Sequence, residues 1–230
     1  MAIHDIAVPD RESLFSSPPF ESVSAEARQT LVLRSRFVPF SQDEVVFSQG
    51  ERVHVLAFVC SGHIKLSSTA AQGKECVLHI IRKNSFLDLG VLLYESGLPY
   101  SAIALSCGVL AVIDKEVFLE ILAKNFAFCL RCMRFLTARQ RLFINKLVGS
   151  QGRIAVSCRV ASWLLHRSRM EGTDELHFDI GRELMARLLG VTRESLSREL
   201  SRLAEMGYIA VERRSIALLD KNALEKLTRL

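Results

Sequence analysis

The sequence lacks the features that usually identify enzymes, membrane proteins and secreted proteins. It contains no G-x-S-x-G, P-loop or H-E-x-x-H motif, and its six histidines do not cluster near a Ser or Cys nucleophile. No uninterrupted apolar run approaches the ~20 residues of a membrane helix. The first residues, MAIHDIAVPDRESLF, lack the basic and apolar stretches of a signal peptide. We therefore expect a cytoplasmic protein that has no membrane segment and is not an enzyme.

The net charge and the cysteine content exclude few further classes of protein. A net charge of +5 is a weak indication of a polyanionic partner, because an ordinary solvated surface gives the same value. Six cysteines in a cytoplasmic chain are not expected to form structural disulfides, which leaves buried thiols, a redox switch or metal ligands. Cys129 and Cys132 are the closest pair. On a continuous helix they share one face, unlike the loop-borne pairs of zinc sites, so two buried thiols are the favoured interpretation.

The first half of the chain changes from a polar lead-in to short strands. Residues 1–20 predict a loose segment, and 21–33 have helical spacing. Up to about residue 115, short β-branched runs alternate with glycine turns, a pattern typical of a barrel or jelly roll. The predicted strands are 45–51, 55–68, 75–81 and 102–114. The expected fold class is α+β, beginning with a β-barrel of the jelly-roll kind.

From Lys115 the apolar period becomes helical. The pattern predicts a short helix over 115–125 and a long one over 127–154. A single surface helix needs one apolar face, but this long helix has nearly two. One face is expected to pack on the barrel and the other on a second copy, and Phe135 and Leu142 are expected to be dimer contacts. A homodimer follows. The first face contains Phe128, Cys132, Phe135, Leu136, Leu142, Phe143, Leu147 and Ile154, and the second Leu130, Met133, Ile144 and Val148.

The C-terminal part predicts a helix over 158–168, followed by helix, tight turn, helix and hairpin over 178–219. Asp179 can cap the first helix of this set, and Gly190 can supply the left-handed residue at its end. Thr192 can cap the next helix, which Gly207 stops. The segment YIAVERRSIALL alternates around a polar tip, as the two strands of a wing would.

The second helix of this helix-turn-helix carries polar side chains on one side of its first two turns. Arg193, Glu194, Ser197 and Arg198 project together, with Ser195 beside them, while three leucines point to the other side. Arg can bond guanine, Glu can accept from a cytosine amine, and Ser can reach base edges or phosphate. An ordinary amphipathic helix with solubilising charges is the alternative, and the turn and wing around it favour DNA binding. The predicted DNA-binding residues are Thr192, Arg193, Glu194, Ser195, Ser197, Arg198, Arg213 and Arg214.

The segment TRESLSRELSRLAEMGYIAVERRSIALLD resembles the recognition helix and wing of the CRP/FNR superfamily of bacterial transcription regulators, and RVASWLL resembles the start of their DNA-binding domain. The upstream segment VVFSQGERVHVLAFVCSGHIKLSSTAAQGKECVLHIIRKNSF is similar to their cyclic-nucleotide-binding-like barrel. The resemblance implies an effector-sensing barrel over 20–126, a dimerisation helix over 127–154 and a winged helix-turn-helix over 155–230. It implies a dimer on a palindromic operator, with RNA polymerase as a further partner.

The resemblance also places an effector pocket. Family members that bind cyclic AMP hold the ribose with a Glu and the phosphate with an Arg–Ser pair. Here Asp88 stands at the ribose position, and Tyr100-Ser101 replaces the Arg–Ser pair. A buried phosphate without its Arg loses its strongest charge-assisted partner, so cyclic AMP is not expected to bind. Ile144 and Asn145 lie where the adenine would meet the long helix.

Other branches of the superfamily leave the effector open. The N-terminal cysteine cluster of FNR-type regulators is absent, since the first cysteine is Cys60. Regulators of nitric-oxide stress and denitrification are similar in lacking both the phosphate-binding Arg and the N-terminal cysteine cluster. Similarity to this branch implies a haem as a candidate effector group. His79 is the first candidate ligand, although a lone His in a strand is more often structural. The other candidates are His54, His63, Cys76 and Met133 for haem, and Cys129 and Cys132 for a metal.

Two interpretations of the whole chain remain. The first is a sequence-specific regulator that binds an inverted repeat close to TGTGA–N6–TCACA, because the chain keeps Arg193 where family members with this preference have Arg. The second is a cyclic-nucleotide-type regulatory subunit that acts on a protein partner. It leaves residues 178–219 without an explanation.

Overall fold

A computed structural model describes residues 8–69, 75–150, 155–178 and 180–228, and within these it leaves undescribed the side chains of 141–143, 145–150 and 170. The chain divides into two compact units, Met1–Arg139 and Gln140–Leu230. Each unit has its own apolar core. Among the described residues no helix is long and apolar enough to cross a membrane.

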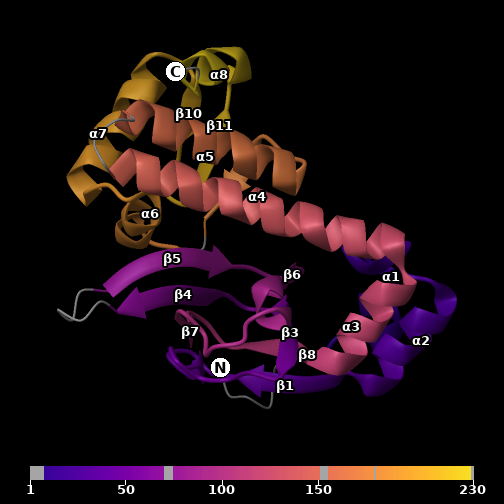
Figure 1. The fold of residues 1–230 in the computed structure, drawn as a ribbon. Coiled ribbons are helices and arrows are strands. Elements are labelled where there is room, and N and C mark those ends of the chain that lie inside the picture. Colours follow the sequence, from indigo (N-terminus) through magenta and orange to yellow (C-terminus); the bar gives the residue numbers. More distant parts are fainter. Residues whose placement is uncertain (1–7, 70–74, 151–154, 179, 229–230) are drawn as a thin grey trace. The chain divides into compact units, whose positions relative to one another are not determined.

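Unit 1 is built on two four-stranded antiparallel sheets (Figure 1). The strands therefore form a two-sheet jelly-roll arrangement and not one closed barrel. Residues of both sheets, such as Phe58 and Leu66, enter the same core. One sheet has the order β1 (Arg36–Phe40), β8 (Gly108–Asp114), β3 (Val55–Ser61), β6 (Ser85–Phe86), and the other β2 (Val45–Phe47), β7 (Ser101–Ala104), β4 (Ile64–Thr69), β5 (Glu75–Ile81). The strand β1 was not expected from the sequence.

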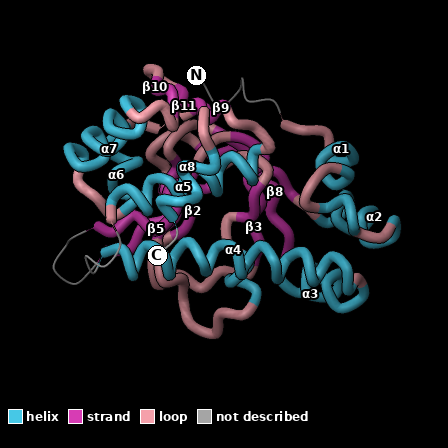
Figure 2. Tube along the Cα trace, turned by 90° about the horizontal axis from the view of Figure 1, so that it is seen from above, coloured by secondary structure: helices cyan, strands magenta, loops and turns pink. Residues whose placement is uncertain are grey.

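The N-terminal segment is helical and packed, so the prediction of a loose lead-in is wrong for residues 11–20. Helix α1 (Arg11–Ser16), the 3-10 turn η2 (Phe20–Ser22) and α2 (Ala25–Arg34) lie with α3 (Lys115–Lys124) at one end of the strands (Figures 1 and 2). They are held by a cluster of buried rings in mostly edge-to-face contacts, a geometry that aromatic quadrupoles favour. The cluster contains Phe15, Phe20, Phe58, Phe86, Phe118 and Phe128, with Phe135 at its edge.

Helix α4 (Phe126–Ser150) is the long helix that the sequence predicted, and residues 151–154 of the prediction lie outside the described part. Its first turns belong to unit 1. Phe128 and Cys132 are buried there, and Phe135 packs against the core with its ring 5.9 Å from that of Phe86. Phe135 is half-buried and packs on its own unit, and its expected role as a dimer contact stays a prediction. The side chain of Leu142 lies outside the described residues.

Unit 2 consists of helices around a small antiparallel sheet. Its helices are α5 (Val156–Glu171), α6 (Arg182–Leu189), α7 (Arg193–Glu205) and α8 (Lys221–Thr228). Its sheet has the order β10 (Ile209–Val211), β11 (Ser215–Leu218), β9 (Glu175–His177). The expected wing of two strands is thus a sheet of three, because β9 pairs with β11. Helix α8, whose Leu224 is fully buried in the core, was also not expected from the sequence.

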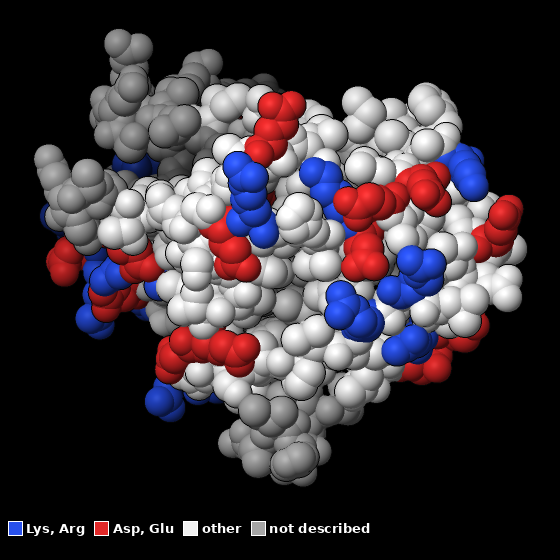
Figure 3. Space-filling view, turned by 60° about the horizontal axis from the view of Figure 1, so that its bottom comes forward, with Lys and Arg blue, Asp and Glu red and all other residues white. Residues whose placement is uncertain are grey.

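Charges of both signs lie on the surface. On the face drawn in Figure 3, Lys and Arg side chains lie beside Asp and Glu side chains, with broad uncharged areas between them. This face presents no continuous basic surface, which agrees with the small net charge of +5. Neither this face nor the net charge therefore indicates a DNA-binding surface.

Candidate nucleic-acid interface and effector pocket

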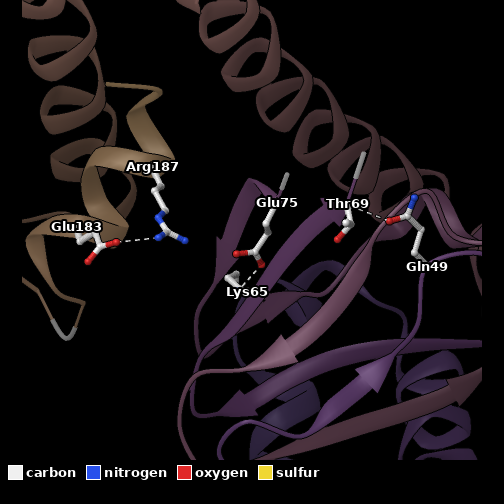
Figure 4. Close-up of polar contacts among 6 residues, drawn as sticks. All are labelled: Gln49, Lys65, Thr69, Glu75, Glu183 and Arg187. Carbon is white, nitrogen blue, oxygen red and sulfur yellow. Dashed lines mark hydrogen bonds and ion pairs between the residues drawn. The ribbon is translucent and has the colours of Figure 1, made fainter. Parts of the chain in front are cut away.

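Helices α6 and α7 form the predicted helix-turn-helix. Gly190 ends α6 in the left-handed region, with φ +65°, and its N–H bonds the carbonyls of Ala186 and Arg187. A side chain at that φ would be strained, which explains why glycine stands there. The N-cap of α6 is Gly181, so the prediction that Asp179 caps this helix is wrong, and Asp179 itself lies outside the described residues. An ion pair between Glu183 and Arg187 runs along α6 (Figure 4).

The start of α7 is fixed by Thr192, as predicted. Its side-chain oxygen accepts the N–H of Ser195 at 3.1 Å, and its hydroxyl donates to the Ser195 oxygen at 2.9 Å. Three leucines, Leu196, Leu200 and Leu203, are buried on the inner face of the helix. The cap sets where the helix begins, and the leucines set which face points outward.

The outward face of α7 carries the predicted recognition residues. Arg193, Glu194, Ser197 and Arg198 are all exposed, and Ser195 is half-buried beside them. Among the described residues, no hydrogen bond or ion pair occupies the guanidinium of Arg193 or Arg198. Both groups are therefore available to an acceptor outside the chain, at the helix end that also favours anions.

The wing lies between β10 and β11. Arg213 and Arg214 are exposed at its tip, where the backbone turns after Glu212. The carbonyl of Arg214 accepts the N–H of Phe178, and Ser215 donates to the Glu212 carboxylate at 3.1 Å. These bonds brace the tip and leave both guanidinium groups exposed.

Arg159 of α5 holds the turn between α6 and α7, a role that sequence reasoning missed. Its Nη1 donates to the carbonyl of Gly190 at 2.8 Å and to that of Leu189 at 3.3 Å. These are carbonyls at the end of α6 that have no partner within the helix. Arg159 directly precedes the apolar VASWLL run. The position of this single Arg beside an apolar run was the sequence feature that could have indicated its structural role.

The side of α4 that does not face unit 1 is apolar and exposed. Its members recur at spacings of four and three, the pattern of a two-helix seam. Their exposed fractions are 79% for Phe126, 37% for Leu130, 55% for Met133 and 49% for Ile144, with exposed Thr137 and Gln140 between them. We call these six residues the α4 seam. Two apolar faces are therefore present in the described part of this helix, and the predicted members Leu142, Phe143, Leu147, Val148 and Ile154 lie outside that description.

Unit 1 contains a small pocket next to the predicted effector residues Asp88 and Tyr100. Its apolar walls include Val55, Ala57 and Leu98. The remaining space has room for about one water molecule. Tyr100 is buried, and its hydroxyl donates to Asp88 Oδ2 at 2.7 Å. Burial and the Asp88 carboxylate raise the pKa of Tyr100 far above its usual range.

Two further residues complete this site, and the sequence analysis did not single them out. Tyr94 donates to Asp88 Oδ2 at 3.2 Å, and burial followed by the Asp88 charge raises the pKa of Tyr94 to about 12. Arg139 of α4 places Nη1 3.8 Å from Asp88 Oδ1 and donates to the carbonyl of Leu87 at 2.6 Å. Side chains from the segment after β6 and from α4 thus meet in one polar cluster, in which Asp88, Tyr100 and Arg139 are buried and Tyr94 is exposed.

The other predicted pocket residues either do not line this pocket or have side chains that the structure does not describe. Ser101 begins β7, and its oxygen accepts the backbone N–H of Gln49, whose side chain in turn accepts the N–H of Thr69 (Figure 4). His79 is half-buried in β5, opposite Leu66 of β4. The Lys65–Glu75 ion pair joins the same two strands (Figure 4). Ile144 is exposed on α4, and the side chain of Asn145 is outside the described residues.

The candidate haem and metal ligands are dispersed. Within the described ranges no three His, Cys, Asp or Glu residues come together in a way that could hold a metal ion. None of the candidate ligands His54, His63 or His79 lines the pocket beside Asp88, and that pocket has room for about one water, so its residues do not fit a haem. Burial raises the pKa of Cys132 to about 12, which keeps it a neutral thiol near pH 7. Cys129 beside it is half-buried.

Comparison with known families matches both units. Residues 37–125 match the family described as a cyclic nucleotide-binding domain, and residues 158–227 match the Crp-like helix-turn-helix domain. The first segment lies in unit 1 and the second in unit 2. The second match accounts for residues 178–219, which the interpretation as a regulatory subunit of another protein left unexplained.

Individual relatives match nearly the whole chain. The CRP-like cAMP-activated global transcriptional regulator of Mycobacterium tuberculosis is 27% identical over 217 residues, covering 91% of this chain and 96% of the relative. The probable transcriptional regulator flp of Lacticaseibacillus casei is 24% identical, covering 90% and 94%. These relatives are transcription regulators and not enzymes, as the sequence predicted.

Solved structures show the same fold at lower identity. FixK2 from Bradyrhizobium japonicum has a TM-score of 0.71 at 17% identity, covering 85% of this chain and 98% of that one. A CooA mutant from Carboxydothermus hydrogenoformans has a TM-score of 0.70 at 17% identity, covering 97% and 98%. With a cyclic nucleotide-binding domain in unit 1 and a Crp-like helix-turn-helix in unit 2, this chain belongs to the CRP/FNR family of transcription regulators.

Proposed function

We propose that the chain is a homodimer that binds an inverted repeat close to TGTGA–N6–TCACA through α7. The observation that carries this proposal is the row of exposed side chains on α7, in which the guanidinium groups of Arg193 and Arg198 have no bonding partner among the described residues. In a winged helix-turn-helix the second helix enters the major groove by its N-terminal end. Arg193 and Arg198 then read guanines by bidentate bonds to O6 and N7, and Glu194 accepts from a cytosine amine.

The remaining polar residues of this interface have supporting roles. Ser197, one turn after Arg193 on the same face, can contact a neighbouring thymine or phosphate. Thr192 and Ser195 form the cap at the helix end that enters the groove, where backbone N–H groups attract a phosphate. Arg213 and Arg214 in the wing contact phosphates. Replacing either wing arginine with Ala should weaken binding to all sequences alike and lower the salt dependence.

The α4 seam supports the dimer. Phe126, Leu130, Met133 and Ile144 form an apolar stripe that unit 1 leaves uncovered, and its spacing suits a parallel or antiparallel helix pair. A second copy of the same helix is the occupant that fits, because a two-fold interface buries the same stripe on both chains. An inverted-repeat operator has the matching symmetry. RNA polymerase is the further partner that a regulator bound near a promoter would contact.

The effector pocket does not suit cyclic AMP. Tyr100 stands where a phosphate would need a cation, and its hydroxyl already bonds Asp88. Arg139 supplies a guanidinium, but its Nη1 is held by the Leu87 carbonyl and lies next to the Asp88 carboxylate. Titration calorimetry should therefore detect no binding at micromolar cyclic AMP. Micromolar affinity would contradict this.

Selection from random DNA tests the proposed function. Purified protein is incubated with random duplexes, and bound DNA is amplified over several rounds. We expect an inverted repeat with TGTGA half-sites, whereas TTGAT half-sites or no palindrome would contradict the base assignments. Arg198→Ala should relax the choice at one guanine at a cost of about 1–3 kcal/mol. If no DNA is selected and a protein partner is bound instead, the chain is a regulatory subunit and the proposal is wrong.

A further inference from the structure

The pocket of unit 1 is occupied by the chain's own side chains. Tyr100 is buried and lines the pocket together with Val91 and Leu98, and its hydroxyl donates to Asp88 Oδ2 at 2.7 Å. After this filling, the pocket has room for about one water molecule. A molecule the size of a nucleotide can therefore enter this pocket only if lining side chains such as Tyr100 move.

Displacement of Tyr100 would leave a buried carboxylate short of donors. Asp88 is almost fully enclosed, with 8% of its side chain exposed, and it depends on protein groups in place of water. Its Oδ1 accepts the Gly90 N–H at 2.9 Å, and its Oδ2 accepts the hydroxyls of Tyr100 and Tyr94. Removing one donor from a buried charged acceptor costs more than the bond itself contributes, so the filled state is strongly favoured.

The same carboxylate positions helix α4. Arg139 has only 9% of its side chain exposed, and its guanidinium lies between the Asp88 carboxylate and the Leu87 carbonyl. A single buried guanidinium thus ties α4 to the segment that carries Asp88. Arg139 and Asp88 both belong to unit 1, so this link holds α4 within that unit.

We propose that Tyr100 is an internal ligand of unit 1: its phenol takes the place of a small-molecule effector, completes the Asp88–Arg139 tie and holds α4 on the sheets without any bound molecule. The consequence is DNA binding that needs no effector. This inference rests on the proposed DNA-binding function. Because the internal ligand is a phenol that donates to a carboxylate, free phenols can be used to replace it in an experiment.

The test removes the internal ligand and supplies it again. Tyr100→Ala should leave an apolar cavity that a small aromatic molecule can enter, as engineered core cavities do. We expect a melting temperature lower by about 10 °C, faster alkylation of buried Cys132 on α4, and roughly tenfold weaker operator binding. Millimolar p-cresol should restore all three values toward wild type. Toluene, which fills space but donates no hydrogen bond, should restore less.

Two more variants separate loss of the hydrogen bond from loss of the ring, and both from the effect of any substitution nearby. Tyr100→Phe retains the ring, so a folded protein is expected, and it should lose part of the Cys132 protection because Asp88 loses its shortest side-chain donor. Leu93→Ala changes an exposed residue nearby and serves as the matched control. Wild-type protein that is unfolded, freed of small molecules and refolded should bind the operator fully without additives.

The outcomes separate this inference from the proposed function. If Tyr100→Ala keeps wild-type Cys132 protection, or if p-cresol and toluene act alike, the internal-ligand role is wrong even when DNA binding stands. That role is also wrong if refolded wild type binds the operator only after a small molecule is added. If wild type binds no DNA but p-cresol restores stability and Cys132 protection to Tyr100→Ala, the proposed function fails and the internal ligand stands.

Discussion

Replacing Met133 with Glu tests whether the α4 seam joins two copies. Met133 is 55% exposed and sits in the middle of a stripe whose other apolar members are Phe126, Leu130 and Ile144. Because the exposed part of the side chain points away from unit 1, a polar replacement is tolerated by the isolated unit. In a dimer the same position is enclosed by the partner helix.

The expected loss follows from the exposed surface. Full burial of a Met side chain contributes about 1.5–3 kcal/mol, so the exposed half of Met133 contributes roughly 1 kcal/mol per protomer. A carboxylate enclosed in the seam adds a desolvation cost of about 1 kcal/mol or more. Both protomers change, which gives about 4 kcal/mol for the dimer. The dissociation constant should therefore rise roughly a thousandfold.

Sedimentation equilibrium measures this directly. The matched control is Leu33→Glu, which places the same charge at an apolar residue of α2 that is 70% exposed and lies outside the seam. Met133→Glu should give folded monomers, with unchanged circular dichroism and weakened operator binding, while Leu33→Glu should remain dimeric. A Met133→Glu protein that is as dimeric as wild type would refute the assignment of the seam.

Three further outcomes follow from local geometry. Gly190→Ala should destabilise unit 2 by about 1–2 kcal/mol in urea unfolding, because its φ of +65° is unfavourable for L-residues, whereas Gly181→Ala should change little since its φ is −68°. Spectrophotometric titration should show that Tyr100 in folded protein ionises at a higher pH than tyrosine in the unfolded chain, because burial and the Asp88 carboxylate raise its pKa. The raised pKa favours the neutral phenol, so its stabilisation is complete below the ordinary tyrosine pKa of about 10 and is lost as pH rises further. Alkylation at pH 7 should modify exposed Cys76 well before Cys132, and equal rates would show that Cys132 is not buried.

Local patterns in the sequence were sufficient for most of unit 2. The left-handed Gly190, the cap at Thr192 and the buried Leu196 follow from short-range backbone chemistry, so the helix-turn-helix and its outward face could be predicted. The third strand of the wing could not, because β9 has only three residues and is defined by its pairing with β11.

The arrangement of the pocket beside Asp88 could not be predicted from the sequence, because its polar contacts depend on how the chain folds. Asp88 and Tyr100 were predicted pocket residues, but their mutual hydrogen bond depends on how the segment after β6 folds back on itself. Arg139 lies 51 positions beyond Asp88 and is brought to it only by packing of α4 on unit 1. The absence of a phosphate-binding Arg at position 100 stays a prediction, and nothing in the sequence indicated that Tyr100 donates to Asp88 within the pocket.

The central claim is that α7 reads guanines through Arg193 and Arg198, and a double-mutant cycle on DNA measures it most directly. Fluorescence anisotropy compares wild type and Arg198→Ala on the TGTGA inverted repeat and on the same duplex with one guanine replaced in each half-site. If Arg198 contacts that guanine, either change alone should weaken binding by about 1–3 kcal/mol, and both together should cost little more than one. Additive losses at every guanine, or equal affinity of wild type for both duplexes, would contradict the account.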